Sequence, residues 1–543
     1  MPTLEANLVD IVNRSIKPVR LTYGRRIESI ESLESDVPCE TYLMPGFIDA
    51  HVHVESSMLT PAQFAAAAVV HGTVATVSDP HEIANVLGTP GIEYMLRDAD
   101  RVPLKFCFGA PSCVPATPFE TAGSSLDVDA TGRLLDHAKI HYLAEMMNFP
   151  GVLAGDAEVS EKINAALQRG MLVDGHAPGL THDEATRYFA AGITTDHECT
   201  SLQEAVERAE IGVMVQIREG SAARNFDALW PLIEQYPERV MFCSDDKHPN
   251  DLLRGHIDEM CRRAIANGCD LFDVLTAACV SPVRHYGLSV GQLRVGDPAD
   301  FVEVTSLTTF EVRQTVIDGQ CVAKDGESLV EVASAPTINH FSCSQKAVGE
   351  FSVAARNAKR IRVINAHDRL LTTSCLIMEP NVCDDHLVAD TKRDLLKLCV
   401  VNRYEDTTPA VAFVRSFGLR RGAIAGSVAH DSHNIIGVGA TDDDLCLAVN
   451  SVIESQGGLA IADGGDISTL PLPVAGLMSN LTCRDVAHRY EHLDGLAKKL
   501  GCKLQDPFMT LSFMALLVIP ALKLSDKGLF DVERFEFVDL IFD

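Results

Sequence analysis

The chain has 543 residues, of which 46% are hydrophobic and 22% are charged. A chain of this length is too long to fold around a single hydrophobic core, so about three domains are expected. The composition is that of a folded protein and excludes wholesale disorder. The net charge of −29 argues against binding to the phosphate backbone of nucleic acids or to an anionic membrane surface, so we expect neither partner.

The cysteines and the apolar runs indicate where the protein resides. The 16 cysteines form no CxxC pair and no zinc-finger spacing, which is typical of reduced and buried thiols. Residues 1–6 lack the basic and apolar segments of a signal peptide. The longest apolar run, 508–522, is too short and too interrupted to span a bilayer. We therefore expect a cytoplasmic protein with a buried core segment at 508–522.

Strand-like and helix-like segments alternate over 46–285, after three short β-like segments at 8–13, 25–29 and 41–44. Short apolar runs predict eight strands, at 48–53, 73–78, 106–109, 142–147, 172–176, 194–197, 213–217 and 240–244. Helical spacing lies between most of them, at 61–71, 91–99, 160–169, 181–191 and 202–209. Eight repeats of this alternation predict an α/β chain with a (β/α)8 barrel, similar to the TIM barrel, at 46–285.

Two further domains are expected around the barrel. A turn at Gly296 and Pro298, a strand after Ala299 and β-like residues at 312–322 predict a small β unit. We expect this unit to pair with the N-terminal segments in a small β-sandwich domain built from 1–45 and 286–335. A C-terminal α+β domain is expected at 340–543, with strands at 360–365, 411–416, 423–427 and 435–439 and helices at 443–456 and 483–500.

The first barrel strand delivers two histidines to one side. Side chains alternate across a strand, so His51 and His53 point the same way, with Asp49 below them. Two neutral imidazoles that converge on one point are typical of a divalent-metal site. This spacing alone is equally compatible with two histidines that bind nothing.

The ends of four other predicted strands supply further metal-binding side chains. Active sites of (β/α)8 barrels lie at the C-terminal ends of the strands. Glu145 lies on the fourth strand, and His176, His197 and Asp245 end the fifth, sixth and eighth. Each could be a hydrogen-bonded core residue when considered alone. Six such residues at five strand ends predict a metal site.

Other polar residues follow strand ends at the same rim. After the second strand, His81 or Glu82 could orient a water or a substrate, and capping of the next helix by Glu82 is the alternative. Arg218, Glu219 and Ser221 follow the seventh strand and could reach a substrate, although the sequence favours a solvated loop there.

A polar segment in the C-terminal region contains His430, Asp431, His433 and Asn434. Asp and Asn side chains stabilise turns by bonding the nearby backbone. The sequence predicts such a turn, and no sequence pattern places it in the barrel mouth.

The order of these ligands resembles a known superfamily. PGFIDAHVH at 45–53, followed by a strand-four ligand and then His, His and Asp, resembles the amidohydrolase superfamily, in which many members carry a carboxylated lysine where this chain has Glu145. Within it, the chain resembles the bacterial-type adenine deaminases over nearly its whole length. The similar segments are AEMMNFPGVLAG (144–155), VDGHAPGL (173–180), TDHECTS (195–201), CSDDKHP (243–249), RGAIAGSVAHDSHNI (421–435) and LPLPVAGLMS (470–479).

This resemblance implies a reaction and a set of roles. The reaction is the hydrolytic deamination of adenine to hypoxanthine and ammonia in purine salvage or adenine catabolism, through a hydroxide held by two divalent cations. The cations would be Mn²⁺ or Fe²⁺, with Zn²⁺ also suited to the ligands. The implied metal ligands are His51, His53 and Asp245 for one cation, His176 and His197 for the other, and Glu145 as the bridge.

The expected catalytic residues are Asp245, which would accept the proton of the bound water, Glu145 and His81. The expected substrate-binding residues are Glu82, Arg218, Glu219 and Ser221. The resemblance also implies a homo-oligomer, such as a dimer.

Two alternative functions remain open from the sequence, and a third is disfavoured. Another amidohydrolase could act on a cyclic amide, an N-acetyl sugar, or a related aminopurine or nucleoside. A non-catalytic assembly protein could retain the barrel, although such descendants tend to lose metal ligands. A cytidine-deaminase-like enzyme is disfavoured because the HxE and PCxxC pattern is absent.

Overall fold

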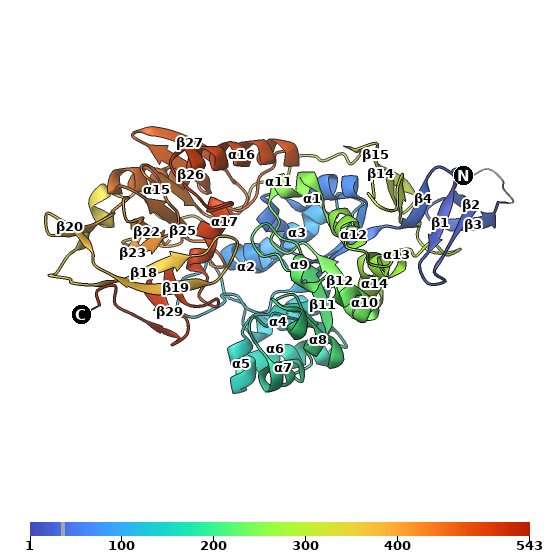
Figure 1. The fold of residues 1–543 in the computed structure, drawn as a ribbon, viewed down its shortest axis with the longest axis horizontal. Coiled ribbons are helices and arrows are strands. Elements are labelled where there is room, and N and C mark those ends of the chain that lie inside the picture. The colour runs from blue at the N-terminus through green and yellow to red at the C-terminus, as the bar shows by residue number, and fades with distance from the viewer. Residues whose placement is uncertain (34–38, 543) are drawn as a thin grey trace.

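The computed structural model describes residues 1–33 and 39–542. The predicted barrel occupies the middle of the molecule, between an N-terminal sheet and the C-terminal region (Figure 1). One parallel sheet contains five of its strands: β5 (Phe47–Val52), β6 (Thr73–Ser78), β7 (Lys105–Ala110), β8 (Ile140–Met146) and β9 (Leu172–Gly175). A second parallel sheet contains β10 (Thr195–Asp196), β11 (Met214–Arg218) and β12 (Val240–Cys243).

Backbone hydrogen bonds join these two sheets on both sides. At one seam, the N–H of Asp245 donates to His51 O at 2.9 Å, and the N–H of His53 donates to Asp245 O at 3.3 Å. At the other seam, the N–H of Thr194 donates to Val173 O at 2.9 Å. The (β/α)8 prediction is confirmed, and all eight strands lie where the sequence predicts them.

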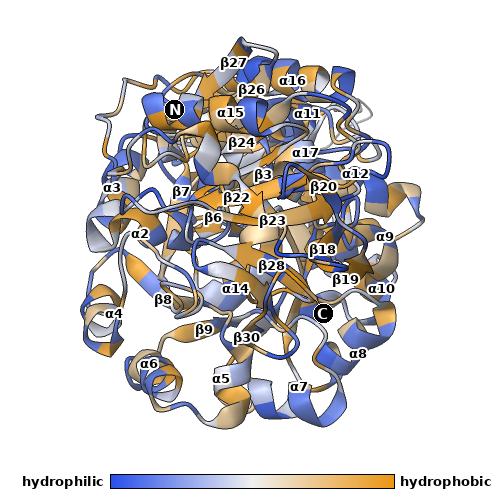
Figure 2. Ribbon diagram, turned by 90° about the vertical axis from the view of Figure 1, so that its left-hand side faces the viewer, coloured by the Kyte–Doolittle hydropathy of each residue, from blue (hydrophilic) through white to orange (hydrophobic). Residues whose placement is uncertain are grey.

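Amphipathic helices cover the outside of the barrel. Helices α4, α6 and α8 begin at Asp127, Asp156 and Ser201, whose side chains each accept the N–H three residues further on. Figure 2 shows much hydrophilic colour on α7 and α8, whereas the C-terminal strands β22 and β23 are mainly hydrophobic. The covering helices are α1 (Pro61–Ala68), α3 (Thr89–Ala99), α4 (Val128–Leu135), α6 (Ala157–Gln168), α7 (His182–Phe189), α8 (Leu202–Glu210) and α12 (Ile257–Ala266). Shorter helices are α2 (His81–Leu87), α5 (Phe149–Ala154), α9 (Phe226–Leu229), α10 (Leu232–Gln235), α11 (Pro249–Arg254), α13 (Leu271–Leu275) and α14 (Ser281–Tyr286).

The N-terminal strands and the strands after the barrel pair with each other, as predicted. They form one continuous eight-stranded sheet, whereas the sequence predicted a small β-sandwich. Strand β4 pairs antiparallel with β13 and so joins the two segments. The strands are β1 (Thr3–Asp10), β2 (Ser15–Tyr23), β3 (Ile27–Ser32), β4 (Tyr42–Pro45), β13 (Phe301–Val304), β14 (Val312–Ile317), β15 (Gln320–Lys324) and β16 (Glu327–Ser328).

The C-terminal region contains a second eight-stranded sheet, with α15 (Asp442–Glu454) packed on it and α16 (Cys483–Lys499) beside it. Its strands are β18 (Ile361–Ala366), β19 (Thr373–Met378), β22 (Leu396–Val401), β23 (Ala410–Arg415), β24 (Ala423–Gly426), β25 (Ile435–Gly439), β26 (Gly458–Asp463) and β27 (Asp466–Pro471). Two three-stranded sheets complete it: β17 (Val353–Ala354), β21 (His386–Val388) and β20 (Asn381–Cys383), and β28 (Leu522–Ser525), β29 (Gly528–Asp531) and β30 (Glu536–Phe537).

The apolar segment at 508–522 lies in the core, as predicted. Helix α17 (Pro507–Ser512) within it is buried along its whole length. Within residues 1–33 and 39–542, no helix combines the length and the apolar character that a membrane crossing requires. The division of the chain into domains at the predicted boundaries stays a prediction.

Candidate active site

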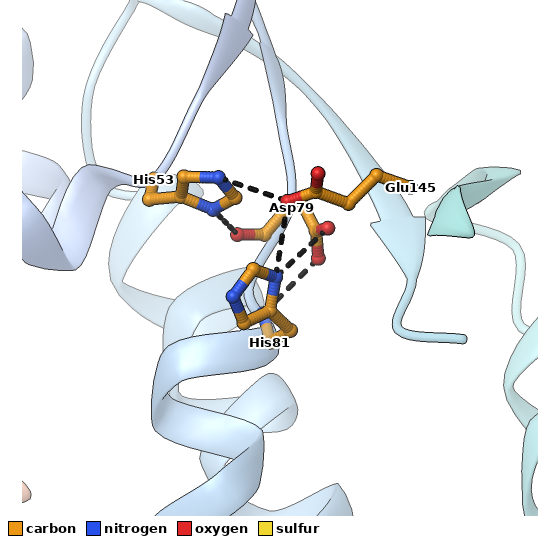
Figure 3. A group of neighbouring side chains, drawn as sticks. All are labelled: His53, Asp79, His81 and Glu145. Atoms are coloured by element: carbon orange, nitrogen blue, oxygen red, sulfur yellow. Dashed lines mark hydrogen bonds and ion pairs between the residues drawn. The ribbon is translucent and has the colours of Figure 1, made fainter. Parts of the chain in front are cut away.

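Six side chains converge at the C-terminal ends of the barrel strands, and each is 6% exposed or less. His53 Nε2 lies 3.2 Å from Glu145 Oε1 and 3.1 Å from Asp245 Oδ1. Figure 3 shows His53 and Glu145 reaching toward each other from their separate strands. The six are the residues that the sequence predicts as metal ligands: His51, His53, Glu145, His176, His197 and Asp245.

The Glu145 carboxylate lies between two pairs of histidines. Its Oε1 faces His53 at 3.2 Å and His51 at 3.8 Å. Its Oε2 faces His176 Nδ1 at 2.8 Å and His197 Nε2 at 3.2 Å. Burial alone would raise the pKa of Glu145, but the imidazoles of His176 and His197 outweigh it and hold the pKa well below its usual range. Each carboxylate oxygen therefore faces a different pair of imidazoles.

The donor set fits divalent cations. Both ring nitrogens of buried His51 lack a hydrogen-bond partner among the described residues, as do His176 Nε2 and His197 Nδ1. His53 Nδ1 lies 3.2 Å from the carbonyl oxygen of Asp79 and can donate to it, which leaves the Nε2 lone pair facing Glu145 and Asp245. Such a backbone bond is the usual way in which a metal-binding histidine is oriented. Imidazole and carboxylate donors together suit Mn²⁺, Fe²⁺ and Zn²⁺.

Asp245 adopts an uncommon backbone conformation, with φ of 52°. A non-glycine residue in this region carries strain, which clusters at functional sites. Its Oδ1 faces His51 and His53, and its Oδ2 accepts a bond from Arg218 Nη1 at 2.7 Å. Burial would raise the pKa of Asp245, but Arg218 and the two histidines keep it well below its usual value. The carboxylate is thus held ionised with one oxygen facing the cluster.

The loop after β11 is buried, so the expectation of a solvated loop is wrong. Arg218, Glu219 and Ser221 are each 5% exposed or less. Arg218 bonds to Glu198 and Asp245, Glu219 pairs with Arg263 at 2.8 Å, and Ser221 donates to Asp251 at 2.7 Å. These partners satisfy most polar groups of the three side chains, whereas Arg218 Nε and Glu219 Oε2 have no hydrogen-bond partner among the described residues. Contact of these residues with a substrate stays a prediction.

Sequence reasoning missed Glu198 and Asp79. Glu198 Oε1 lies 3.5 Å from His176 Nδ1 and 3.4 Å from His197 Nε2, and it accepts from Arg218 at 2.5 Å. Asp79 Oδ2 lies 3.0 Å from His81 Nδ1, and Figure 3 shows this pair beside Glu145. Both residues sit in the polar runs directly after barrel strands, which was the available signal.

The turn predicted at 430–434 is present, and it lies against the barrel, a position that the sequence did not indicate. His430 Nδ1 lies 2.6 Å from Glu82 Oε1, and His433 Nε2 bonds to Glu82 Oε2. Glu82 lies in the first turn of α2, so this segment reaches the rim of the predicted metal site. His81 Nε2 lies 3.5 Å from the same Glu82 carboxylate.

Glu82 joins α2 of the barrel to the C-terminal region through its bonds to His430 and His433. The N–H of Ala429 donates to His433 Nδ1 at 3.3 Å, so the ring proton is on Nε2 and points at Glu82. That tautomer offers no Nε2 lone pair to a cation. Burial lowers the pKa of His433 to about 4, which keeps it neutral. His430 differs: burial lowers its pKa, but Glu82 outweighs this and raises it to about 9. Glu82 therefore binds one cationic and one neutral imidazole of the C-terminal region.

We expect Glu82→Gln to lower the free energy of unfolding by about 3 kcal/mol, because it leaves the cationic His430 buried without its charge partner. Thermal unfolding measures this. Glu93→Gln is the matched control, since Glu93 pairs with Arg97 on the exposed surface of α3 and should leave the midpoint nearly unchanged. Equal midpoints of thermal unfolding for both variants would contradict this stabilising role of Glu82.

A cavity of about 570 Å³ lies at the opposite end of the barrel. It is lined by Lys105, the first residue of β7, and by Tyr286. None of the six predicted ligands lines it. Because barrel chemistry belongs at the carboxyl ends of the strands, the histidine cluster is the better candidate site.

Known protein families match both the barrel region and the C-terminal region of the chain. The model of the amidohydrolase family matches residues 42–322, and the model of the adenine deaminase C-terminal domain matches residues 370–536. A Salinibacter ruber protein named adenine deaminase is 54% identical over 100% of this chain and 99% of its own length. Proteins of the same name from Methanosarcina barkeri and Borreliella burgdorferi are 51% and 46% identical, each over 99% of both chains.

The chain belongs to the adenine deaminase family. The predicted family and barrel fold are confirmed. The match at 370–536 shows that the region after the barrel is the C-terminal domain typical of this family. Membership in the amidohydrolase family implies that the chain binds divalent metal.

Proposed function

We propose that the chain is a hydrolase that deaminates adenine to hypoxanthine and ammonia. The observation that carries this proposal is the Glu145 carboxylate between two pairs of buried histidines, in a chain that resembles proteins named adenine deaminase from end to end. A water oxygen adds to C6 of adenine, and one water proton goes to N1 of the ring. The other water proton goes to the amine nitrogen, the bond between C6 and this nitrogen breaks, and ammonia leaves. The proposed role is purine salvage or adenine catabolism.

Two divalent cations are proposed in the cluster, Mn²⁺ or Fe²⁺ before Zn²⁺. His51, His53 and Asp245 would hold one, His176 and His197 the other, and Glu145 would bridge them. Such a pair of cations, when bound, lowers the pKa of a shared water toward neutrality. Glu198 is a further candidate ligand, since it lies within 3.5 Å of both His176 and His197.

Two side chains of the protein, Asp245 and His81, are proposed to act on the attacking water and the purine. Asp245 presents Oδ1 to the cluster while Arg218 holds Oδ2, so Oδ1 is placed to accept the proton of the attacking water. His81 is oriented through its bond to Asp79 and lies 3.6 Å from Glu145. It is thus placed to orient water or the purine at the cluster.

Spectrophotometric assays on adenine, adenosine and cytosine, after reconstitution with Mn²⁺, test the substrate. We expect turnover of adenine alone. Turnover of adenosine without adenine would overturn the proposal in favour of a nucleoside deaminase.

Location and assembly are part of the proposal. The 16 cysteines are free thiols in the described structure, which supports a reducing, cytoplasmic compartment. A homo-oligomer, such as a dimer, is supported by family resemblance, and light scattering during size-exclusion chromatography tests it.

A further inference from the structure

Asp431 Oδ2 and Glu120 Oε2 are among the buried carboxyl oxygens outside the metal cluster that have no hydrogen-bond partner in the described part of the chain. Asp431 lies between β24 and β25 of the C-terminal region and is 2% exposed. Glu120 lies in the loop after β7 and is 4% exposed. A buried polar atom without a partner is costly and signals a missing ligand or water.

Asp431 lies near the rim of the metal cluster, next to His430, which bonds to Glu82. The charged groups acting on it are His81, Glu82, His430 and Glu145. Its Oδ1 is 3.8 Å from His430 Nδ1. His430 is fixed in turn by Glu82 and by stacking on Phe513, with ring centroids 4.3 Å apart and planes inclined by 5°. The Asp431 carboxyl therefore has a defined position at the rim.

The charge of Asp431 acts on Glu120, which lies in a loop that three hydrogen bonds hold in place. The N–H of Thr121 donates to Asp526 at 2.9 Å, its carbonyl accepts from Asn434 at 2.8 Å, and the N–H of Gly123 donates to Asn85 at 2.7 Å. Thr117 donates to Glu120 Oε1 at 3.1 Å, which leaves Oε2 free.

The two carboxyl groups differ in protonation. Burial raises the pKa of Glu120 to about 8, and the charge of Asp431 adds to this. Burial raises the pKa of Asp431 only to about 6, because His81 and His430 oppose it. Near neutral pH, Glu120 can donate a proton and Asp431 can accept one.

Adenine has the matching chemistry on the edge far from its reacting amine. The C6 amine must lie at the metal cluster, so the opposite edge of the ring, with N3 and the N9–H, points away from it. N3 is an acceptor and N9–H is a donor. A nucleoside lacks this N–H because its sugar is attached to N9.

We propose that Asp431 and Glu120 form the recognition subsite for the free purine base, with Asp431 accepting the N9–H and Glu120 donating to N3. Asp431 is then a specificity-determining residue, supplied by the C-terminal region, that rejects nucleosides. This inference rests on the proposed adenine deamination.

The test compares kcat/KM for adenine and for 9-methyladenine, which lacks the N9–H but carries no sugar. Sites built to bond a substrate N–H reject the analogue that lacks it by about 10⁴-fold. We expect the wild type to prefer adenine by a factor of this order. Asp431→Ala should reduce that preference about 100-fold through the loss of kcat/KM for adenine, with metal content unchanged.

Asp136→Asn is the control. Asp136 is 65% exposed at its side chain and pairs with Arg169 on the surface, so the preference should stay at the wild-type value. Equal wild-type turnover of adenine and 9-methyladenine would overturn the inference, even if Asp431→Ala failed to fold. An unchanged preference in folded Asp431→Ala would also overturn it. Failure of the wild type to deaminate adenine would instead overturn the proposed function.

Discussion

Glu145→Gln is expected to remove nearly all deaminase activity and to lower the metal content from two equivalents to one or fewer. The neutral amide removes the charge between the two histidine pairs, and it turns an NH₂ group toward one of them. We expect kcat to fall roughly 10³-fold or more, which corresponds to about 4 kcal/mol of lost transition-state stabilisation. Elemental analysis and steady-state kinetics on the same preparation measure both effects.

Glu158→Gln is the control for this variant. Glu158 lies on helix α6, is 59% exposed at its side chain and pairs with Lys162 at 2.9 Å. Its neutralisation should therefore change neither the deaminase activity nor the metal content. Full activity together with full metal content in Glu145→Gln would contradict the bridging role.

Asp245→Asn is expected to separate metal binding from proton transfer. The amide oxygen can still face His51 and His53, but it cannot accept the proton of an attacking water, and Arg218 loses one of its two charge partners. General-base catalysis contributes about 10²–10⁴-fold, so we expect kcat to fall within this range while much of the metal remains.

Asp227→Asn is the control for Asp245→Asn. Asp227 pairs with Arg263 on the surface, with a side chain that is 90% exposed. Its neutralisation should leave kcat at the wild-type value. If Asp245→Asn also kept wild-type turnover, another group would have to accept the proton, and the assignment of Asp245 would be wrong.

The barrel could be predicted because its strands are buried on both faces. β12, for example, is buried at every residue and reads as a continuous apolar run. Several strands were missed, among them β2, β22, β26 and β27. β2 alternates exposed Lys17 and Arg20 with buried positions, and β27 buries only Leu470. Their pairing partners stabilise such strands more than their own composition does.

The six predicted ligands could be located because each lies at or just after the end of a recognisable strand. Glu198 was missed although it lies in such a polar run, because side chains on a regular strand alternate and its neighbour His197 already faces the cluster. Strand β10 ends at Asp196, so this alternation no longer holds at Glu198. The contact of His430 with Glu82 joins residues 348 positions apart, and no local pattern reports a pairing of that kind.

Product formation from adenine tests the central claim most directly. The protein is stripped of metal, reloaded with two equivalents of Mn²⁺ and incubated with adenine, and hypoxanthine and ammonia are both quantified. We predict equal amounts of the two products from the reloaded protein and neither from the stripped protein. Equal turnover without metal, or no turnover by folded protein that holds both cations, would contradict adenine deamination at the Glu145 cluster.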